Sequence, residues 1–470
     1  MSQSLVISGE SGAGKTESTK LLVRYVAFRA RAAAGAPASA LSESLVRSNP
    51  SLEAFGNAST TRNANSSRFA KFTRLHVGAD GGLQRAVVVT YLLERSRVTL
   101  HAHGERNFHI FYLLLHAAAQ PGSPWPAALE LPAAAAPADF FYLRPAPLAG
   151  AGSGRSPPPP AVGAAGRSAD AGPTDLATTL AVLHAAGVSA ADASAVIAVV
   201  AAILHLGQAA FAPAAGGSDG AALCGGGATV DAARKLLGLA DLRPLLLERR
   251  LSVPGADELV IQLTPQQCAG ARDALSRALY ELCFAFLVRA INRGLGGLVD
   301  DAPFIGLLDV FGFENFGTNS FEQLCINYAN ERLQQLLVER LFKAELKLYT
   351  VEGVPVPGGA AAASFADNLG CVEMFSASPS GIFRLLDSQC ISPQATDAKF
   401  IGSVNMTHST SPFLRPPGAR GVASSDTFIV KHYAGEVTCA RGARARRSGG
   451  RSRRVCGRLV GQLAGRGRAP

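Results

Sequence analysis

The residues most able to do chemistry stand near the start of the chain, in the run Gly9-Glu10-Ser11-Gly12-Ala13-Gly14-Lys15-Thr16. This pattern predicts a phosphate-binding loop, because its glycines let backbone N–H groups wrap a phosphate. Lys15 would reach the β and γ oxygens, and the Thr16 hydroxyl would bind Mg²⁺. A chance glycine-rich turn is the alternative. The β-like run Leu5–Ile7 before the loop and the helical pattern Thr19–Ala30 after it favour the nucleotide site.

Two further polar segments could complete a site for Mg²⁺ and a nucleotide. Asn63-Ala64-Asn65-Ser66-Ser67-Arg68-Phe69 supplies amides and hydroxyls just before a strand pattern. Asp309-Val310-Phe311-Gly312-Phe313-Glu314 supplies a carboxylate where another strand pattern ends. A nucleotide site of this class needs a second Mg²⁺ ligand and an acid at the end of a neighbouring strand. Taken singly, either segment could equally be a capped turn or an Asp that closes a strand, but their order after the loop favours the site.

The elements that must position these segments can be read from the hydrophobic pattern. Four strands are expected, at Leu5–Ile7, Phe69–Val77, Ala86–Leu93 and Phe304–Leu308. Long helices are expected at Asp175–Leu206, Gln266–Arg293 and Ser320–Tyr349, the last opened by the capping-box spacing Ser320…Gln323. Residues 117–172 are rich in Ala, Gly, Ser and Pro, which predicts a loop or a disordered insertion.

Composition excludes several classes of protein. A chain of 470 residues with 48% hydrophobic content can bury a large core, so general disorder is not expected. The longest apolar run, Val196–Leu204, suits a buried helix and falls short of the roughly 18 residues of a membrane span. The eight cysteines form no C-x-x-C pair, so neither a zinc site nor a redox motif is indicated.

The net charge of +10 is located at one end of the chain. Residues 441–470 hold ten arginines and no acid, and the rest of the chain has as many basic as acidic residues. This tail is also rich in glycine and contains no aromatic residue, so it gives only a weak signal for nucleic-acid binding. We expect no nucleic-acid partner.

Together, these motifs resemble the myosin motor domain. Gly9–Thr16 is similar to its P-loop, Asn63–Phe72 to its switch I and Asp309–Glu314 to its switch II. Further similar segments are Leu52–Ala58, Tyr91–Val98, Phe108–Tyr112 and Asn319–Gln335, the last of which looks like the relay helix. The resemblance implies an α/β P-loop NTPase with a mixed, mostly parallel sheet and helical upper and lower subdomains, incomplete at both ends. It assigns residues 1–437 to a partial motor domain and residues 438–470 to an Arg/Gly-rich low-complexity tail.

The resemblance also implies a role for each site residue. Lys15, Asn63 and the amides of the P-loop would hold the phosphates. Thr16, Ser67 and Asp309 would hold Mg²⁺, with Asp309 acting through its water shell. Ser66 and the Gly312 amide would sense the γ-phosphate, and Arg68 would form a salt bridge with Glu314 that closes switch I onto switch II. Ala70 departs from the family, which usually has glycine there, and a methyl group is tolerable if φ is negative.

The implied activity is ATP-dependent movement on actin, with Mg²⁺ and ATP as cofactors and the actin filament as partner, in the cytoplasm and cytoskeleton. Gly381–Thr396 resembles the helix–loop–helix that meets actin, and Asp257 and Glu258 lie near an acidic loop position of the upper subdomain. We expect no membrane span, and no light chains because the lever is missing. Two alternatives stay open: a kinesin-like P-loop motor, and a truncated non-motor product with weak nucleotide or actin binding only.

Overall fold

The structure is a computed structural model that describes residues 2–9, 12–34, 40–145, 175–215, 220–251, 258–297, 302–316, 319–355, 365–392, 396–415 and 427–440. The chain divides into two compact units. The first contains residues 1–7 and 14–310, and the second contains residues 8–13 and 311–470. Asp257 and residues 441–470 of the predicted arginine tail lie outside the described residues, whereas residues 438–440 end a strand.

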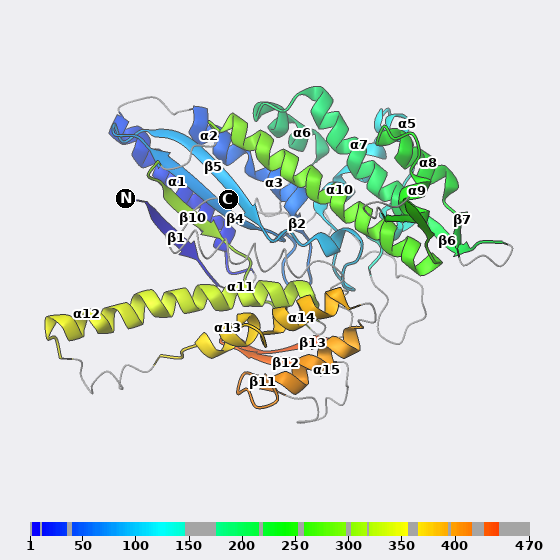
Figure 1. The fold of residues 1–470 in the computed structure, drawn as a ribbon. Coiled ribbons are helices and arrows are strands. Elements are labelled where there is room, and N and C mark those ends of the chain that lie inside the picture. Colours follow the sequence, from blue (N-terminus) through cyan, green and yellow to red (C-terminus); the bar gives the residue numbers. More distant parts are fainter. Residues whose placement is uncertain are drawn as a thin grey trace. The chain divides into compact units, whose positions relative to one another are not determined.

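The first unit contains a four-stranded sheet with the order β1-β10-β4-β5 (Figure 1). Its strands are β1 (Gln3–Ile7), β10 (Ile305–Asp309), β4 (Ala70–Val77) and β5 (Leu83–Tyr91). β1 pairs with β10 in parallel, whereas β10 with β4 and β4 with β5 are antiparallel. The predicted strands and the mixed sheet are therefore confirmed, but the prediction that the sheet is mostly parallel is wrong.

The antiparallel pairs follow from how the chain returns to the sheet. A short turn joins β4 to β5, closed by a hydrogen bond of 2.9 Å from Gly78 N to Gly82 O, with Gly81 at φ +77°. A tight hairpin can join only antiparallel strands. β4 and β10 are far apart in the chain, so no local pattern reveals the direction in which they pair.

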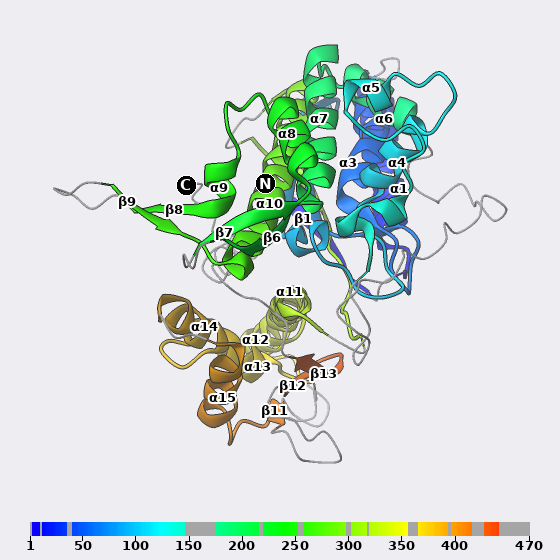
Figure 2. The same cartoon turned by 90° about the vertical axis from the view of Figure 1, so that its right-hand side faces the viewer.

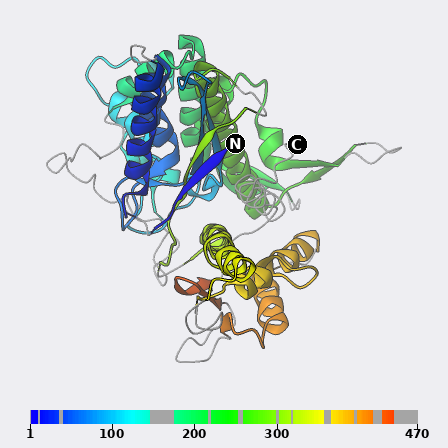
Figure 3. The same cartoon turned by 90° about the vertical axis from the view of Figure 1, so that its left-hand side faces the viewer.

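Helices cover this sheet and supply the rest of the unit. α1 (Lys15–Ala34) packs against β10 and β1 (Figure 3). α10 (Pro265–Gly294) begins at a capping box made by Thr264 and Gln267, and it packs beside α7 (Ala190–Gly207) (Figure 2). The predicted helices Asp175–Leu206 and Gln266–Arg293 are thus confirmed, the first as two helices.

An aromatic cluster joins α10 to elements that lie on both sides of the switch I segment in the chain. The Tyr280 ring stacks on Phe108 and Phe111 at centroid distances of 4.8 and 5.5 Å. Its hydroxyl donates a hydrogen bond of 2.8 Å to the carbonyl of Phe55. Stacked aromatic rings stabilise a core beyond the area that they bury. The stacking fixes α10 against the start of the helix at residues 109–118, and the hydrogen bond to Phe55 fixes it against residues 49–56.

α7 has the length and hydropathy of a membrane-crossing helix, and no other helix in the described ranges does. Most of its residues are buried in the core, including Ile197, Val200 and Leu204. A core helix passes the same compositional test, so the arrangement agrees with the buried helix predicted around Val196–Leu204.

Residues 117–145 do not form the loop or insertion that their composition suggested. The chain continues in α4 (His109–Ala118), makes α5 (Trp125–Ala128) and two 3₁₀ turns, η2 (Pro137–Asp139) and η3 (Phe141–Leu143). Leu129, Leu131 and Leu143 are buried in the core cluster. A few large apolar residues spaced among alanines are enough to anchor the segment in the core. The overall composition of the segment, which is dominated by small residues, did not reveal them. Residues 146–172 lie outside the described residues.

The other elements of the first unit are short. They are α2 (Ala40–Arg47), α3 (Asn49–Gly56), β2 (Asn57–Ala58), β3 (Ser66–Ser67), η1 (Arg95–Val98), α6 (Leu176–Ala185), β6 (Ala210–Pro213), β7 (Ala221–Gly225), α8 (Gly227–Leu236), α9 (Arg243–Leu247), β8 (Glu248–Leu251) and β9 (Leu259–Gln262). The pairs β2–β3, β6–β7 and β8–β9 each form a two-stranded sheet.

The second unit is built around one long helical stretch. α11 (Phe321–Leu337) continues through a π-helical segment, Val338–Lys343, into α12 (Ala344–Glu352). The helix predicted at Ser320–Tyr349 is confirmed, and so is its capping box, in which Gln323 pairs with Ser320. Tyr328 packs on the rings of Phe375 and Phe383 at centroid distances of 5.3 and 5.0 Å, which places the buried face of α11 on the helices that follow.

Those helices and a small sheet complete the second unit. They are α13 (Leu369–Ser376), α14 (Ile382–Ile391), α15 (Asp397–Thr407), β11 (Leu414–Arg415), β12 (Thr427–His432) and β13 (Gly435–Ala440), with the strand order β11-β12-β13. Of the helix–loop–helix expected at Gly381–Thr396, the range contains only α14 and the residue before α15, because α15 begins at Asp397. Residues 393–395 lie outside the described residues.

β5 is an outer strand of the main sheet, and the C-terminal end of α10 covers its edge. The Asn292 side chain accepts a hydrogen bond of 2.7 Å from Val88 N and donates one of 2.8 Å to Val88 O. The carbonyl of Leu295 accepts a bond of 3.1 Å from Ala86 N. Edge strands otherwise present unpaired backbone groups, so one asparagine substitutes for a neighbouring strand.

Replacing Asn292 with alanine should therefore destabilise the first unit. The change leaves the N–H and C=O of Val88 buried without these partners, which costs about 2 kcal/mol or more of unfolding free energy. Urea unfolding of the full chain measures it, with exposed Arg293→Ala as the control that should change stability little. Equal stability of the two variants would show that the edge does not depend on Asn292.

Candidate phosphate and magnesium site

The phosphate-binding loop joins β1 to α1. β1 ends at Ile7 and α1 begins at Lys15. Gly12 and Gly14 have φ angles of +85° and +80°, a left-handed conformation that strains residues with a side chain. The N-terminus of a helix favours an anion because its first N–H groups point outward. The predicted Glu10 and Ser11 lie outside the described residues, and Gly9 and Ala13 precede the helix as expected.

Asp309 lies beside the start of α1. The parallel register pairs Ile7 with Asp309, so the strand that enters the loop and the strand that carries the acid end together. The Thr16 hydroxyl is hydrogen-bonded to Asp309. Burial raises the pKa of Asp309, and the positive charges of Lys71 and Lys15 together with the Thr16 bond only partly oppose it. The structure therefore brings together two of the three predicted Mg²⁺ ligands.

A buried lysine of β4 completes this charged environment. The Lys71 Nζ donates a hydrogen bond of 3.0 Å to Asn49 Oδ1, and burial lowers its pKa although the charges of Asp309 and Glu53 oppose that change. Lys71 was not among the residues predicted for the site. A lone lysine inside an apolar strand was the available signal, because a buried cation requires a carboxylate nearby.

The switch I segment is held by local hydrogen bonds. The Asn63 Oδ1 accepts a bond of 2.9 Å from Asn65 N, and the Ser66 hydroxyl accepts one of 3.2 Å from Arg68 Nη1. The Ser67 hydroxyl donates to the carbonyl of Phe69 at 2.7 Å. Because the Ser67 oxygen acts as the donor there, its lone pairs can still face a cation.

Glu53 of α3 connects this segment to the helix of the phosphate-binding loop. One of its carboxylate oxygens lies 3.0 Å from Lys20 Nζ of α1, and the other accepts a bond of 3.2 Å from Asn65 Nδ2. The Asn65 Oδ1 in turn lies 3.1 Å from His109 Nε2. Sequence reasoning missed Glu53, because its role depends on contacts between elements that are distant in the chain.

Ala70 is compatible with this geometry. It is the first residue of β4 and pairs with Tyr91 in the antiparallel ladder. Among the described residues, only Leu92 and Glu130 combine a side chain with positive φ. Ala70 therefore does not have a positive φ, and its methyl group is tolerated.

Arg68 and Glu314 belong to different units, and their predicted salt bridge stays a prediction. Arg68 is fully buried, and its Nε donates a bond of 2.6 Å to Glu94 Oε2. In the second unit, Glu314 is buried beside α11, where it accepts a bond of 3.2 Å from Gln323 Nε2 and exchanges backbone bonds with the Asn327 amide. Gly312 lies two residues before Glu314 and is buried.

A second buried carboxylate, Glu331 of α11, organises the second unit. It accepts hydrogen bonds from His432 Nδ1 at 3.0 Å, from Tyr433 N at 2.8 Å and from the Asn368 amide. The ligand atoms of Glu331, Cys371 and His432 are close enough to one another to hold a metal ion. However, burial and the Glu331 charge raise the pKa of the Cys371 thiol, and Glu331 already accepts several donors. The cluster therefore suits a structural hydrogen-bond network.

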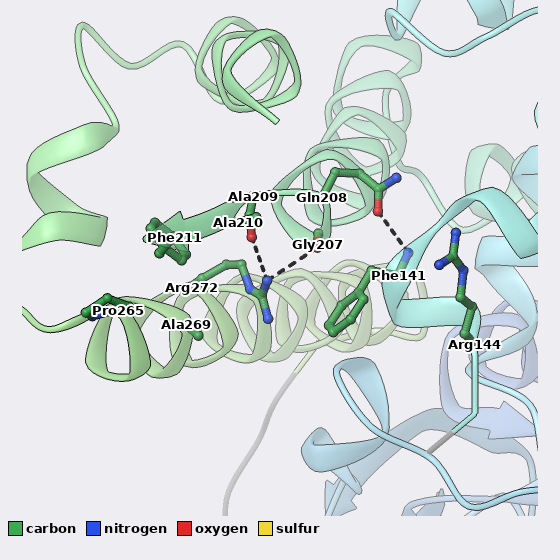
Figure 4. A pocket seen from close by; sticks show the side chains of 10 residues that line it. All are labelled: Phe141, Arg144, Gly207, Gln208, Ala209, Ala210, Phe211, Pro265, Ala269 and Arg272. Atoms are coloured by element: carbon green, nitrogen blue, oxygen red, sulfur yellow. Dashed lines mark hydrogen bonds between the residues drawn. The ribbon is translucent and has the colours of Figure 1, made fainter. Parts of the chain in front are cut away.

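A pocket of about 430 Å³ lies away from the phosphate site, between the end of α7, β6 and the start of α10 (Figure 4). Arg272 lines it. The Arg272 guanidinium donates to the carbonyl of Ala209 at 2.7 Å and to the Asp273 carboxylate at 2.8 and 2.9 Å. Its charge is therefore neutralised inside the unit, which makes the pocket a poor anion site.

Comparison with known proteins supports the similarity seen in the motifs. The model of the family "Myosin head (motor domain)" matches residues 1–442. Myosin-I heavy chain of Dictyostelium discoideum is 35% identical over 439 residues, which cover 93% of this chain and 17% of that protein. Myosin-9 of Arabidopsis thaliana is 36% identical over 456 residues, which cover 93% of this chain and 26% of that protein. Unconventional myosin-XV of Homo sapiens is 35% identical over 445 residues, which cover 93% of this chain and 11% of that protein. The chain spans about a quarter or less of these relatives.

His109 should make the first unit sensitive to acid. Burial, and then the nearby charges of Arg106 and Arg97, lower its pKa to about 4. Below pH 6.5 the unfolded chain binds a proton that the folded chain resists, so stability is lost as the pH falls from about 6.5 to about 4. His109→Gln should reduce this loss, by up to about 1.4 kcal/mol per pH unit. Exposed His116→Gln on the same helix is the control, and an unchanged pH profile in His109→Gln would contradict the assignment.

Proposed function

This chain belongs to the myosin head (motor domain) family, and from that premise we propose that it binds and hydrolyses Mg·ATP as part of an actin-based motor. The observation that supports this proposal most strongly is the hydrogen bond between Thr16 and Asp309, at the edge of the sheet where the parallel strands β1 and β10 end. Hydroxyl and carboxylate oxygens are the ligands that Mg²⁺ prefers. The donor set therefore fits the ion that the family uses.

The phosphate site works by position and charge. Lys15 and the N–H groups at the start of α1 offer positive charge to the β and γ phosphates, and Asn63 lies on the loop expected to contact them. Thr16, Ser67 and Asp309 would hold the ion, which would supply positive charge to the phosphates during transfer. Phosphoryl transfer needs little covalent help from a protein, so this preorganisation provides most of the acceleration.

The switch residues would couple hydrolysis to movement. Ser66 and the Gly312 amide are proposed to sense the γ-phosphate, and the bridge from Arg68 to Glu314 would enclose the attacking water. Loss of the γ-phosphate would then release the bridge. α11 begins at Phe321 and contacts Glu314 through Asn327, and this contact supports the proposal that α11 carries the change outward.

Actin is the proposed partner, in the cytoplasm and cytoskeleton. The α14–α15 pair of the second unit exposes large apolar side chains, among them Ile391 and Met406. Exposed apolar residues of this size are typical of interaction surfaces. In the first unit, Glu258 is exposed at the β8–β9 hairpin.

Two other interpretations of the chain, a kinesin-like motor and a truncated non-motor product, lead to different expectations. Membership of the myosin family rules out the kinesin-like alternative. The truncated, non-motor alternative predicts nucleotide binding without actin-stimulated hydrolysis, so an actin titration of the ATPase rate distinguishes it from our proposal.

Lys15→Ala should weaken Mg·ATP binding by roughly a hundredfold, because a buried charge contact with phosphate contributes a few kcal/mol. Titration with a fluorescent ATP analogue measures the dissociation constant. Arg24→Ala, which removes an exposed charge from the same helix, is the control and should bind normally. Equal affinity in the two variants would refute the phosphate site.

The Arg68–Glu314 bridge can be tested by a double-mutant cycle. Arg68→Ala and Glu314→Ala should each slow the hydrolysis step by roughly a hundredfold, since each removes preorganised stabilisation of the transition state. The double variant should be no slower than either single variant, because both changes remove one interaction. Single-turnover chemical quench measures the step, and additive losses would show that the residues act separately.

A further inference from the structure

Four charged side chains lie buried in a row behind the switch I segment of the first unit. They are Arg68, Glu94, Arg97 and Glu105, and their side-chain exposures are 0%, 8%, 3% and 6%. Their charges alternate in sign along the row. Buried charges are costly unless they are paired and hydrogen-bonded, so the contacts within this row decide how each side chain is held.

Glu94 is the residue that contacts Arg68. The Glu94 Oε2 accepts hydrogen bonds of 2.6 Å from Arg68 Nε and of 2.6 Å from Arg97 Nε. The Glu94 N–H also donates a bond of 2.9 Å to the carbonyl of Arg68. The side chain and the main chain of Arg68 are thus both bonded to one residue.

These bonds fix the plane of the Arg68 guanidinium. Glu94 engages the Nε end, and the Ser66 hydroxyl accepts a bond of 3.2 Å from Nη1. A guanidinium is planar and carries five donors, so bonds to Glu94 and Ser66 are compatible with a further carboxylate. Glu94 therefore orients Arg68 without competing for all of its donors.

Arg97 holds Glu94 in turn. The Arg97 Nη1 donates to the carbonyl of Arg106 at 2.9 Å, and its Nη2 donates to Glu105 Oε2 at 2.8 Å. Burial alone raises the pKa of Glu94, but the charges and hydrogen bonds of Arg68 and Arg97 outweigh it and lower the pKa to about 2. Glu94 is accordingly ionised at any physiological pH.

The backbone is bent to bring Glu94 into this position. β5 ends at Tyr91, and Leu92 follows with a φ of +54°. A bulky residue rarely adopts this conformation, and it persists only where the surrounding structure fixes it. The turn at Leu92 leads the chain directly to Glu94, so this strain accompanies the contact with Arg68.

We propose that Glu94 is a positioning residue for ATP hydrolysis, which presets the Arg68 guanidinium to meet Glu314 while Arg97 holds Glu94 in place. The proposal rests on the proposed function. Without the Glu94 charge, the Arg68 side chain would have to be oriented during each closure, and that cost would appear in the hydrolysis step. Binding of Mg·ATP, which depends on Lys15 and the start of α1, would change little.

The chain offers a matched control for the test. Glu94→Gln and Glu105→Gln each remove one buried negative charge from beside Arg97 and preserve side-chain shape, but only Glu94 contacts Arg68. In the full chain we would measure the melting temperature, the dissociation constant for Mg·ATP and the single-turnover hydrolysis rate. Glu94→Gln should slow hydrolysis by about tenfold or more and keep the dissociation constant within about twofold. Glu105→Gln should leave both within about twofold, and Glu94→Asp should recover part of the rate.

Equal slowing in the two glutamine variants, with equal losses of melting temperature, would show that the row is only structural and would overturn the proposal. Wild-type hydrolysis in Glu94→Gln would overturn it as well.

Hydrogen exchange at Arg68 Nε, followed by NMR, separates this proposal from the proposed function. Protection should be weaker in Glu94→Gln, whose neutral amide oxygen is a poorer acceptor for two arginines than the carboxylate, and unchanged in Glu105→Gln even if the chain does not hydrolyse ATP. Protection equal to wild type in Glu94→Gln overturns the positioning role, whereas a wild-type chain that binds but does not hydrolyse ATP overturns the proposed function.

Discussion

The parallel pairing of β1 with β10 is the constraint on which the phosphate site depends. Because Ile7 pairs with Asp309 in the parallel register, the C-terminal ends of both strands lie at the same edge of the sheet. The chain then enters α1, whose second residue, Thr16, bonds to Asp309. A slip of one residue would turn each side chain of β10 to the other face of the sheet, and the acid would leave the helix terminus.

Buried charges around this edge are arranged in compensating pairs. Lys71 faces the charges of Asp309 and Glu53, and Arg68 and Arg97 together neutralise Glu94. In a region with little water such pairs act strongly on one another and on any bound phosphate. Removing one partner leaves the other charge unpaired, so we expect loss of the Glu94 charge to lower stability as well as the hydrolysis rate.

The sequence predicted those parts of the fold and the site that depend on neighbouring residues. The loop before Lys15, the strand that ends at Asp309 and the capping box at Ser320 are local patterns, and each lies where it was expected. Glu53, Lys71 and Glu94 were missed, because their partners are brought close only by tertiary packing. The predictions of a mostly parallel sheet and of a loop at residues 117–145 were wrong for the same reason. The direction of the β4–β10 pairing and the packing of residues 117–145 both depend on contacts between distant segments.

The most direct test of the central claim is the dependence of ATP affinity on Mg²⁺ in Thr16→Val. Valine keeps the shape of threonine but removes the hydroxyl that bonds to Asp309. We would titrate ATP into wild type and variant, with Mg²⁺ and with a chelator. If Thr16 and Asp309 form the ion site, Mg²⁺ should strengthen ATP binding in the wild type, and in Thr16→Val this gain should largely disappear. An equal gain from Mg²⁺ in both proteins would contradict the account.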